Sequence, residues 1–204
     1  TVGGDEARGA AHGDRGVLRG IRAEATARRR QGGLRPRPPL LGQGAAQIGS
    51  ARALGGDDFV FPSYRDNGVA YCRGVNPEDI VKAWRGNALA GWDPYTVNVA
   101  TQQIIIGAQT LHATGYAMGQ KFEGKVGDGP DDEATICFFG DGPTSQGDVQ
   151  EGFVRAAVYD PPVVFYCHNH QVATSDPAQR HTPVPPSQPA HDHHTPRHRR
   201  RRRD

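Results

Sequence analysis

Two short polar segments carry residue types that could bind a metal ion and a phosphate. Gly-Asp-Gly at 140–142 follows the apolar run 134–139, and His-Asn-His at 168–170 follows the apolar run 162–167. The flanking glycines let a ligand approach the backbone, and a carboxylate oxygen is a ligand that Mg²⁺ prefers. A helix expected to begin near Thr144–Ser145 would direct free N–H groups toward an anion there. A Gly-Asp-Gly turn alone is more often a plain connection between a strand and a helix. The prediction of a binding site therefore depends on the second segment as well.

The elements around these two segments predict that they lie side by side. Residues 134–139 (ATICFF) and 162–167 (PVVFYC) are typical of buried strands, and 149–159 is typical of a helix. Strand, helix and strand in this order form a βαβ unit with parallel strands. Because ligands bind at the carboxyl ends of such strands, both polar segments are expected at one edge of the sheet.

Other segments add helices before this unit. Residues 42–54 and 76–86 are typical of helices, the second with Asn76 as a cap and Pro77 in the first turn. Residues 57–68 predict a short strand and a turn, and the apolar segment 103–120 has small residues spaced for close helix packing. The predicted fold class is α/β, a parallel sheet with helices on both faces.

Charge divides the chain into three parts. Residues 1–38 contain nine Arg and no Lys, with one helix expected at 21–31. Residues 39–180 carry nine basic and sixteen acidic side chains, a net charge of −7. We expect a binding domain over 39–175. The Pro-, His- and Arg-rich segment 176–204 buries too little apolar surface to offset its ordering entropy, so it is expected to be disordered.

Composition also bears on compartment and partners. No apolar run is long enough to predict a membrane span, and the start lacks the apolar core of a secretory signal. The three cysteines form no CxxC pair, which favours reduced thiols in a cytoplasmic protein. The arginine-rich end could contact phosphates, but the acidic centre argues against specific nucleic-acid binding.

Four segments resemble one known family, in the order in which that family has them. The segments are FPSYRDNGVAYCRG (61–74), WRGNALAGWDPY (84–95), IIIGAQTLHATGYAMG (104–119) and FFGDGPTSQGDVQEGFVRAAV (138–158). They resemble alpha subunits of thiamine-diphosphate-dependent 2-oxo acid dehydrogenases, which act on branched-chain 2-oxo acids or pyruvate. The 26 residues between Gly142 and Asn169 match the interval of the thiamine-diphosphate signature. The resemblance extends over about 21–175 and implies a partial thiamine-diphosphate-binding fold.

The resemblance implies residues that hold the organic part and the diphosphate of the cofactor. Tyr64 and Arg65 match the pair that holds the diphosphate, a role that suits the planar fork of arginine. Ile104 and Ile106 match positions whose backbone lies against the aminopyrimidine ring, and both are also expected to be core isoleucines. Without the resemblance, Arg65 would be interpreted as a solvated surface charge.

The resemblance also implies a magnesium site, with one departure. Asp141 matches the metal carboxylate, Gly142 and Pro143 match backbone contacts to the diphosphate, and Val172 matches a carbonyl ligand. His170 stands where the family has a second Asn whose side chain binds the metal. Imidazole nitrogen is a poor ligand for Mg²⁺, so the site is weakened at this position.

The implied activity is the oxidative decarboxylation of 3-methyl-2-oxobutanoate or pyruvate, with acyl transfer to a lipoyl group. The implied partners are a beta subunit, in a heterotetramer of two alpha and two beta chains, and a lipoyl acyltransferase. No catalytic residue is assigned to this chain, because the activating carboxylate belongs to the beta subunit and none of the nine His matches the active-site histidine. Family members continue well beyond the Asn-Asn block. A truncated, non-catalytic remnant is therefore the alternative, and an arginine-tail binding module is a third.

Overall fold

The computed structural model describes residues 43–85, 91–127, 129, 131–169, 172–173 and 176–177. The chain forms two compact units that divide between Ile104 and Ile105. The expectations for the basic segment 1–38, for His170 and for residues 178–204 lie outside the described residues. Within the described part, no helix is long and apolar enough to cross a membrane.

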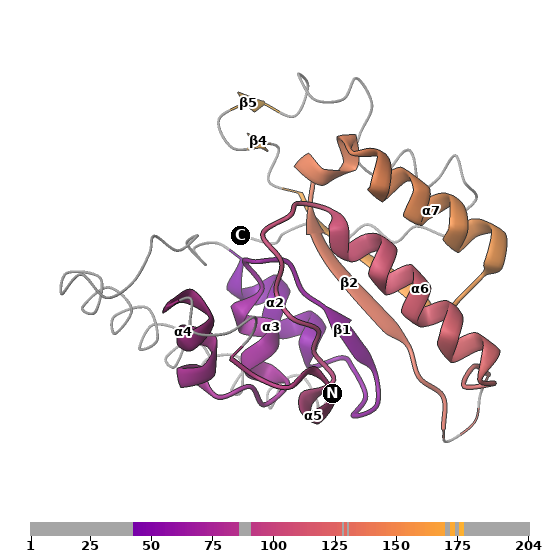
Figure 1. Cartoon of the computed structure of the whole chain (residues 1–204), viewed down its shortest axis with the longest axis horizontal. Helices are drawn as coiled ribbons and strands as arrows, with labels where there is room; N and C mark the ends of the chain where they lie inside the picture. Colours follow the sequence, from indigo (N-terminus) through magenta and orange to yellow (C-terminus); the bar gives the residue numbers. More distant parts are fainter. Residues whose placement is uncertain are drawn as a thin grey trace, which may run out of the picture. The chain divides into compact units, whose positions relative to one another are not determined.

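The first unit is made of short helices around one strand (Figure 1). Its core consists of aliphatic and aromatic side chains such as Ile48, Val60, Val69 and Val99. Val60 and Val99 form a parallel bridge, in which the Val60 N–H donates to the Asn98 carbonyl at 2.9 Å. The elements are α2 (Gly44–Ala51), β1 (Phe59–Phe61), α3 (Asn67–Cys72), α4 (Pro77–Arg85) and α5 (Pro94–Val97).

The expected helices at 42–54 and 76–86 are confirmed as α2 and α4, each with narrower bounds. Helices α3 and α5 were not expected as separate elements. Helix α5 follows ordinary capping rules, because the Asp93 side chain accepts a hydrogen bond from the Tyr95 N–H at 3.0 Å and Pro94 occupies the first turn.

The second unit contains the predicted βαβ unit. Strands β2 (Thr135–Gly140) and β3 (Val163–His168) pair in parallel, from Thr135 opposite Val163 to Gly140 opposite His168. The remaining elements are α6 (Ala108–Phe122), the 3-10 turn η1 (Gly142–Ser145), α7 (Gly147–Tyr159), β4 (Val172–Ala173) and β5 (Asp176–Pro177). The predicted class, α/β with parallel strands, is confirmed.

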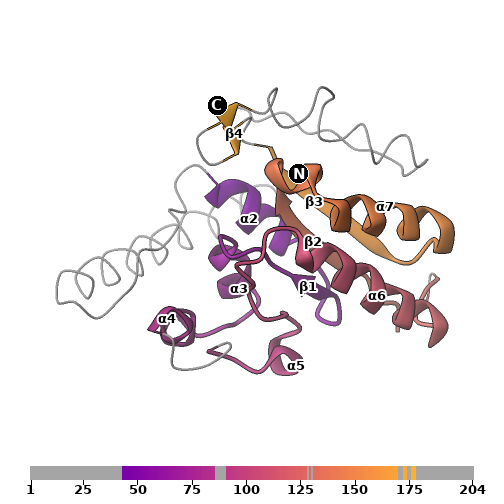
Figure 2. The same cartoon turned by 45° about the horizontal axis from the view of Figure 1, so that its top comes forward.

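Aromatic packing joins α7 to the two strands. Phe153 on α7 is 2% exposed, and its ring meets that of Phe165 on β3 edge to face with centroids 4.8 Å apart. The ring centroids of Phe139 on β2 and Phe153 are 6.1 Å apart, so the Phe153 side chain packs against both strands. Helices α6 and α7 run side by side (Figures 1 and 2). Edge-to-face pairs such as Phe153 and Phe165 stabilise a core by more than the apolar area that they bury.

The apolar segment 103–120 is helical only from Ala108, because Gly107 has a left-handed backbone with φ of +87° and ends the preceding irregular stretch. At the start of the segment expected to be disordered, Asp176 and Pro177 form β5, which pairs with β4 in the antiparallel sense. The rest of that segment lies outside the described residues. The start of the helix thus depends on a backbone dihedral angle, which apolar periodicity does not report.

Gly152, in the interior of α7, is expected to be improved by substitution with alanine. An added methyl group would lie 3.6 Å from backbone and side-chain atoms of Thr110, an ordinary van der Waals distance. Glycine costs about 1 kcal/mol relative to alanine inside a helix. Gly152→Ala should therefore raise the free energy of unfolding by about 1 kcal/mol, measured by urea denaturation. A destabilised variant would show that α6 and α7 approach more closely than this geometry allows.

Candidate functional site

The carboxyl edge of the β2–β3 pair brings together two polar residues that the sequence singled out. Gly140 is the register partner of His168. Asp141 and Asn169 directly follow these partners, so they lie at the same edge of the pair. Asp141 is 4% exposed, whereas Asn169 is exposed. The arrangement places a buried carboxylate beside an accessible amide, and both groups offer an oxygen atom that can bind a metal ion.

The turn after Asp141 is held by its own backbone. The Thr144 N–H and hydroxyl both donate to the Asp141 carbonyl, at 3.2 Å and 2.6 Å. The Gln150 side chain donates to the Thr144 carbonyl at 2.6 Å and so ties η1 to α7. Helix α7 begins at Gly147, two to three residues later than the expected start at Thr144–Ser145, because the 3-10 turn comes first. The turn is therefore held in part by the backbone carbonyl of Asp141, a group that every residue type carries.

Gly142 and Pro143 differ in what they could offer a phosphate. Gly142 has an N–H that can donate, whereas Pro143 has none. The Pro143 carbonyl already accepts a hydrogen bond from the Gln146 N–H at 2.9 Å. Pro143 is buried, and a methyl group added to Gly107 would lie 3.6 Å from its Cβ. We therefore interpret Pro143 as a packing residue of the turn, and Gly142 as the donor of the two.

A half-buried thiol, that of Cys167, lies close to Asp141. Burial, and secondarily the negative charge of Asp141, raise the pKa of Cys167 to about 12. The thiol is thus protonated at neutral pH and is a poor nucleophile and metal ligand. None of the three cysteines forms a disulfide. Among the described residues, no group of three or more His, Cys, Asp or Glu side chains could hold a metal. Beside the Asp141 carboxylate, further metal ligands from the described residues of this edge would thus be backbone or amide oxygens.

Tyr64 and Arg65 belong to the first unit, in the turn between β1 and α3. Both side chains are half-buried. The Arg65 guanidinium carbon lies 5.5 Å from the centroid of the Tyr64 ring, a distance at which a cation is attracted to the ring face. The two residues therefore form one basic, aromatic group. Asp141, Gly142, Pro143 and Ile106 lie in the second unit.

Ile104 and Ile106 are not core residues. Their side chains are 73% and 41% exposed, so the expectation that they are buried isoleucines is wrong. They precede Gly107 in an irregular segment, where apolar side chains have no helix face on which to pack. Of the other predicted site residues, His170 and the side chain of Val172 lie outside the described part of the structure.

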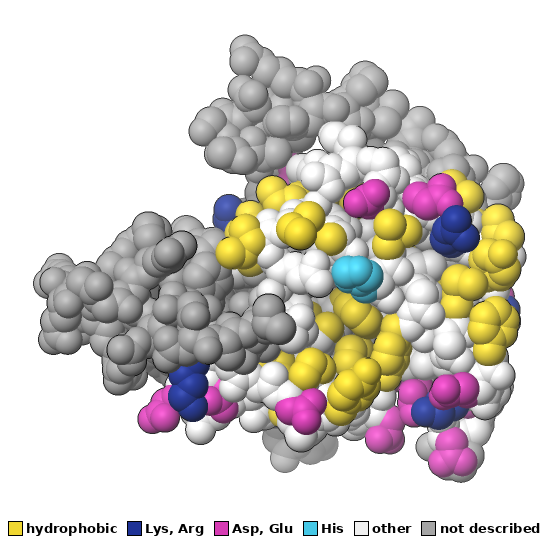
Figure 3. Space-filling view, in the orientation of Figure 1, with side chains coloured by type: hydrophobic (Ala, Val, Ile, Leu, Met, Phe, Trp, Pro, Cys, Tyr) yellow, Lys and Arg dark blue, Asp and Glu magenta, His cyan; other side chains and the backbone are white. Residues whose placement is uncertain are grey.

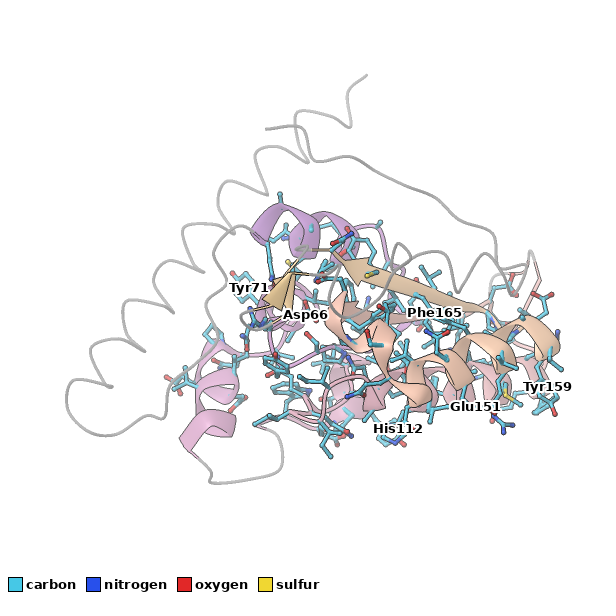
Figure 4. The ribbon with its side chains drawn as sticks, turned by 90° about the horizontal axis from the view of Figure 1, so that it is seen from above. Asp66, Tyr71, His112, Glu151, Tyr159 and Phe165 are labelled. Atoms are coloured by element: carbon cyan, nitrogen blue, oxygen red, sulfur yellow. The ribbon has the colours of Figure 1, made fainter. Side chains whose placement is uncertain are left out.

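Sequence reasoning missed two buried polar residues beside Tyr64 and Arg65. Gln47 on α2 and Asp66 before α3 have no exposed side-chain surface. The Gln47 amide donates to the Arg65 carbonyl at 3.1 Å, and its oxygen accepts from the Gly68 N–H at 3.0 Å. The carboxylate of Asp66, the residue labelled in Figure 4, accepts from the Ser63 N–H at 2.8 Å. A signal for Gln47 existed in the sequence: it is a polar residue in an otherwise small and apolar helix.

Burial raises the pKa of Asp66 to about 6, although hydrogen bonds from Ser63 and the charge of Arg65 oppose the shift. The unperturbed pKa is 3.8, so between these values the folded chain holds a proton that the unfolded chain has released. Stability from this group is complete below about pH 4 and is lost as the pH rises through 6.

The expected loss attributable to Asp66 between pH 4 and pH 7 is up to about 3 kcal/mol. Asp66→Asn, which keeps an oxygen acceptor for Ser63, should remove this dependence. Urea denaturation of both proteins at several pH values measures it, as the difference between their free energies of unfolding. Parallel pH profiles for the two proteins would contradict the raised pKa.

Surface charges on the described residues are mixed. Lys82 pairs with Asp79 at 2.6 Å, Lys125 with Glu133 at 2.9 Å, and Arg155 with Glu151 on α7 at 2.9 Å. The face shown in Figure 3 carries acidic, basic and hydrophobic side chains intermingled. Such a surface differs from the continuous basic stripe typical of nucleic-acid-binding proteins.

Comparison with known proteins places this geometry in a family. Residues 20–188 match the family described as Dehydrogenase E1 component. The chain belongs to the dehydrogenase E1 component family. The match includes β2, the turn after Asp141 and β3, so the edge described above lies within the matched region.

Curated relatives of this E1-component chain carry two names. It is 42% identical over 170 residues to a 3-methyl-2-oxobutanoate dehydrogenase subunit alpha of Mycobacterium tuberculosis, covering 83% of this chain and 44% of the relative. It is 37% identical over 153 residues to a pyruvate dehydrogenase E1 component subunit alpha of Staphylococcus epidermidis, covering 75% and 40%. A Bacillus cereus protein of the same name is 36% identical over 151 residues, covering 74% and 39%. The chain thus spans less than half the length of these relatives.

Proposed function

We propose that this chain provides the diphosphate- and magnesium-binding part of the alpha subunit of a thiamine-diphosphate-dependent 2-oxo acid dehydrogenase. The observation that carries the proposal is the buried carboxylate of Asp141 at the carboxyl edge of β2, next to Asn169 after the paired strand β3. Its partners would be a beta subunit and a lipoyl acyltransferase. The substrate would be 3-methyl-2-oxobutanoate or pyruvate, and the higher identity to the branched-chain relative favours the former.

The donor chemistry of this edge fits a magnesium diphosphate. Mg²⁺ takes hard oxygen ligands and is commonly held by one or two carboxylates together with substrate phosphates. Asp141 supplies one carboxylate, the Val172 carbonyl and the Asn169 amide offer further oxygens, and Gly142 offers an N–H to a phosphate. Tyr64 and Arg65, in the first unit, carry the aromatic and guanidinium groups that we propose for recognition of the diphosphate. When bound, the cofactor supplies the chemistry that decarboxylates the 2-oxo acid.

One residue favours a second candidate function, a chain that keeps the fold but does not hold the metal. His170 stands where the family has an Asn ligand, and an imidazole is a poor ligand for Mg²⁺. On this reading the alpha-type chain would be non-catalytic. The two candidates differ in a single measurable property, which is Mg²⁺-dependent binding of thiamine diphosphate.

The test is a calorimetric titration of thiamine diphosphate into the chain co-purified with a beta subunit of 3-methyl-2-oxobutanoate dehydrogenase. The proposal expects binding with Mg²⁺ and none with EDTA. Absence of binding in both conditions would overturn the proposal. In that case a His170→Asn chain that gains Mg²⁺-dependent binding would establish the second candidate and locate the defect at this ligand.

A further inference from the structure

The turn that carries Tyr64 and Arg65 is held from inside the first unit by two buried polar side chains. Gln47 spans the turn from α2, with its amide on the Arg65 carbonyl and its oxygen on the Gly68 N–H. Its second amide hydrogen goes to the Gln43 side chain at 3.1 Å. Gln47 is fully buried, and a buried amide of this kind must satisfy its hydrogen bonds within the protein. The contact set therefore locks the backbone on both sides of Asp66.

Asp66 holds the other end of the turn, at Ser63. Its carboxylate accepts from the Ser63 N–H at 2.8 Å, and its own N–H donates to the Ser63 carbonyl at 3.1 Å. The Ser63 hydroxyl in turn accepts from the Arg65 N–H at 3.3 Å. Residues 63–68 are thus tied at Ser63, Arg65, Asp66 and Gly68.

These bonds between Gln47, Asp66 and the turn go to backbone atoms or to Ser63, and they leave the side chains of Tyr64 and Arg65 to face outward in part. These hydrogen bonds determine the direction of the Tyr64 and Arg65 side chains without contacting the ligand that the two side chains would bind. Groups that recognise a ligand bind well only when held close to the productive geometry, and buried supporting hydrogen bonds provide that constraint.

We propose that Gln47 and Asp66 are positioning residues, which hold the 63–68 turn so that Tyr64 and Arg65 together present their side chains to the diphosphate. The proposal rests on the proposed function, because it takes the diphosphate as the ligand of that pair. Neither residue contacts the ligand. Loss of either therefore reduces recognition of the diphosphate rather than of the rest of the cofactor.

The test compares affinities for thiamine diphosphate and thiamine monophosphate, with Mg²⁺, in the chain co-purified with its beta subunit. The readout is the ratio of the two Kd values. Gln47→Leu should reduce the preference for the diphosphate about tenfold. Asp66→Ala should do the same, and Asp66→Asn, which keeps an acceptor for Ser63, should restore the preference. The Asp66 pair keeps the test decisive if the Gln47 variant does not fold.

Gln120→Leu is the matched control. Gln120 is also a buried amide, but it bonds Thr135 at 2.7 Å and Glu133 at 3.1 Å in the second unit. Its loss should lower stability and leave the Kd ratio unchanged. In an Arg65→Ala background, Gln47→Leu should change the ratio no further, because the positioned group is gone.

Each result has one meaning. Wild-type chain that binds thiamine diphosphate, with a ratio insensitive to Gln47→Leu and Asp66→Ala, overturns the positioning role alone. Equal changes in the Gln120→Leu control also overturn it, because destabilisation would then explain the effect. Wild-type chain that binds neither ligand overturns the proposed function, and the positioning role with it.

Discussion

Replacing Asp141 by alanine is expected to weaken Mg²⁺-dependent binding of thiamine diphosphate about 100-fold or more. Asp141 is the buried carboxylate at the sheet edge, so its loss would remove the charged ligand that we propose for the ion. The turn itself should survive, since the Thr144 N–H and hydroxyl both bond to the Asp141 backbone carbonyl, which alanine keeps. Calorimetric titration of the chain co-purified with the beta subunit that we propose as its partner, at saturating Mg²⁺, measures the change in Kd.

Asp148→Ala is the matched control for this prediction. Asp148 is exposed in the first turn of α7, where an acidic residue contributes at most about 1 kcal/mol through the helix dipole. Its removal takes the same charge from the same region and should leave the Kd almost unchanged. A comparable loss in both variants would mean that general electrostatics, and not a ligand at Asp141, accounts for the effect.

Much of the second unit could be predicted because two kinds of signal agree there. The apolar runs at 134–139 and 162–167 correspond to β2 and β3, each displaced by one residue. The strands extend to Gly140 and His168 because these two residues pair with each other. Since parallel strands end at one edge, the approach of Asp141 and Asn169 followed from strand order alone.

The first unit was less predictable, because hydrogen bonds between distant residues shape it. Gln47 and Gly68 are 21 residues apart, and their bond is invisible to any local pattern. At Ile104 and Ile106, by contrast, a local pattern exists but predicts the wrong environment. Their apolar character predicts burial, but the chain is irregular before Gly107 and leaves them exposed. Periodicity identifies elements; it does not report which polar side chains hold a turn.

Gly107→Ala is expected to destabilise the fold by about 3 kcal/mol. Gly107 precedes α6 with φ of +87°, a left-handed conformation that costs an alanine about 1–2 kcal/mol. An added methyl group would also lie 2.9 Å from Cγ2 of Val149 and 2.8 Å from Oε1 of Gln146. Gln146 is exposed and its flexible side chain can move away. Val149 is fully buried and stiff, so its overlap must be relieved by shifting α7.

Gly152→Ala serves as the control for Gly107→Ala, because the same chemical change should have the opposite sign. A methyl group added at Gly152 would lie at ordinary contact distance from its neighbours. At Gly107 the added methyl group would overlap its neighbours, and the backbone is left-handed. Urea denaturation of the two variants and wild type measures both effects. Equal stability of the two variants would contradict the close approach at Gly107. The shift falls on the start of α7, next to the η1 turn that follows Asp141, so the variant should also weaken the cofactor binding that we propose.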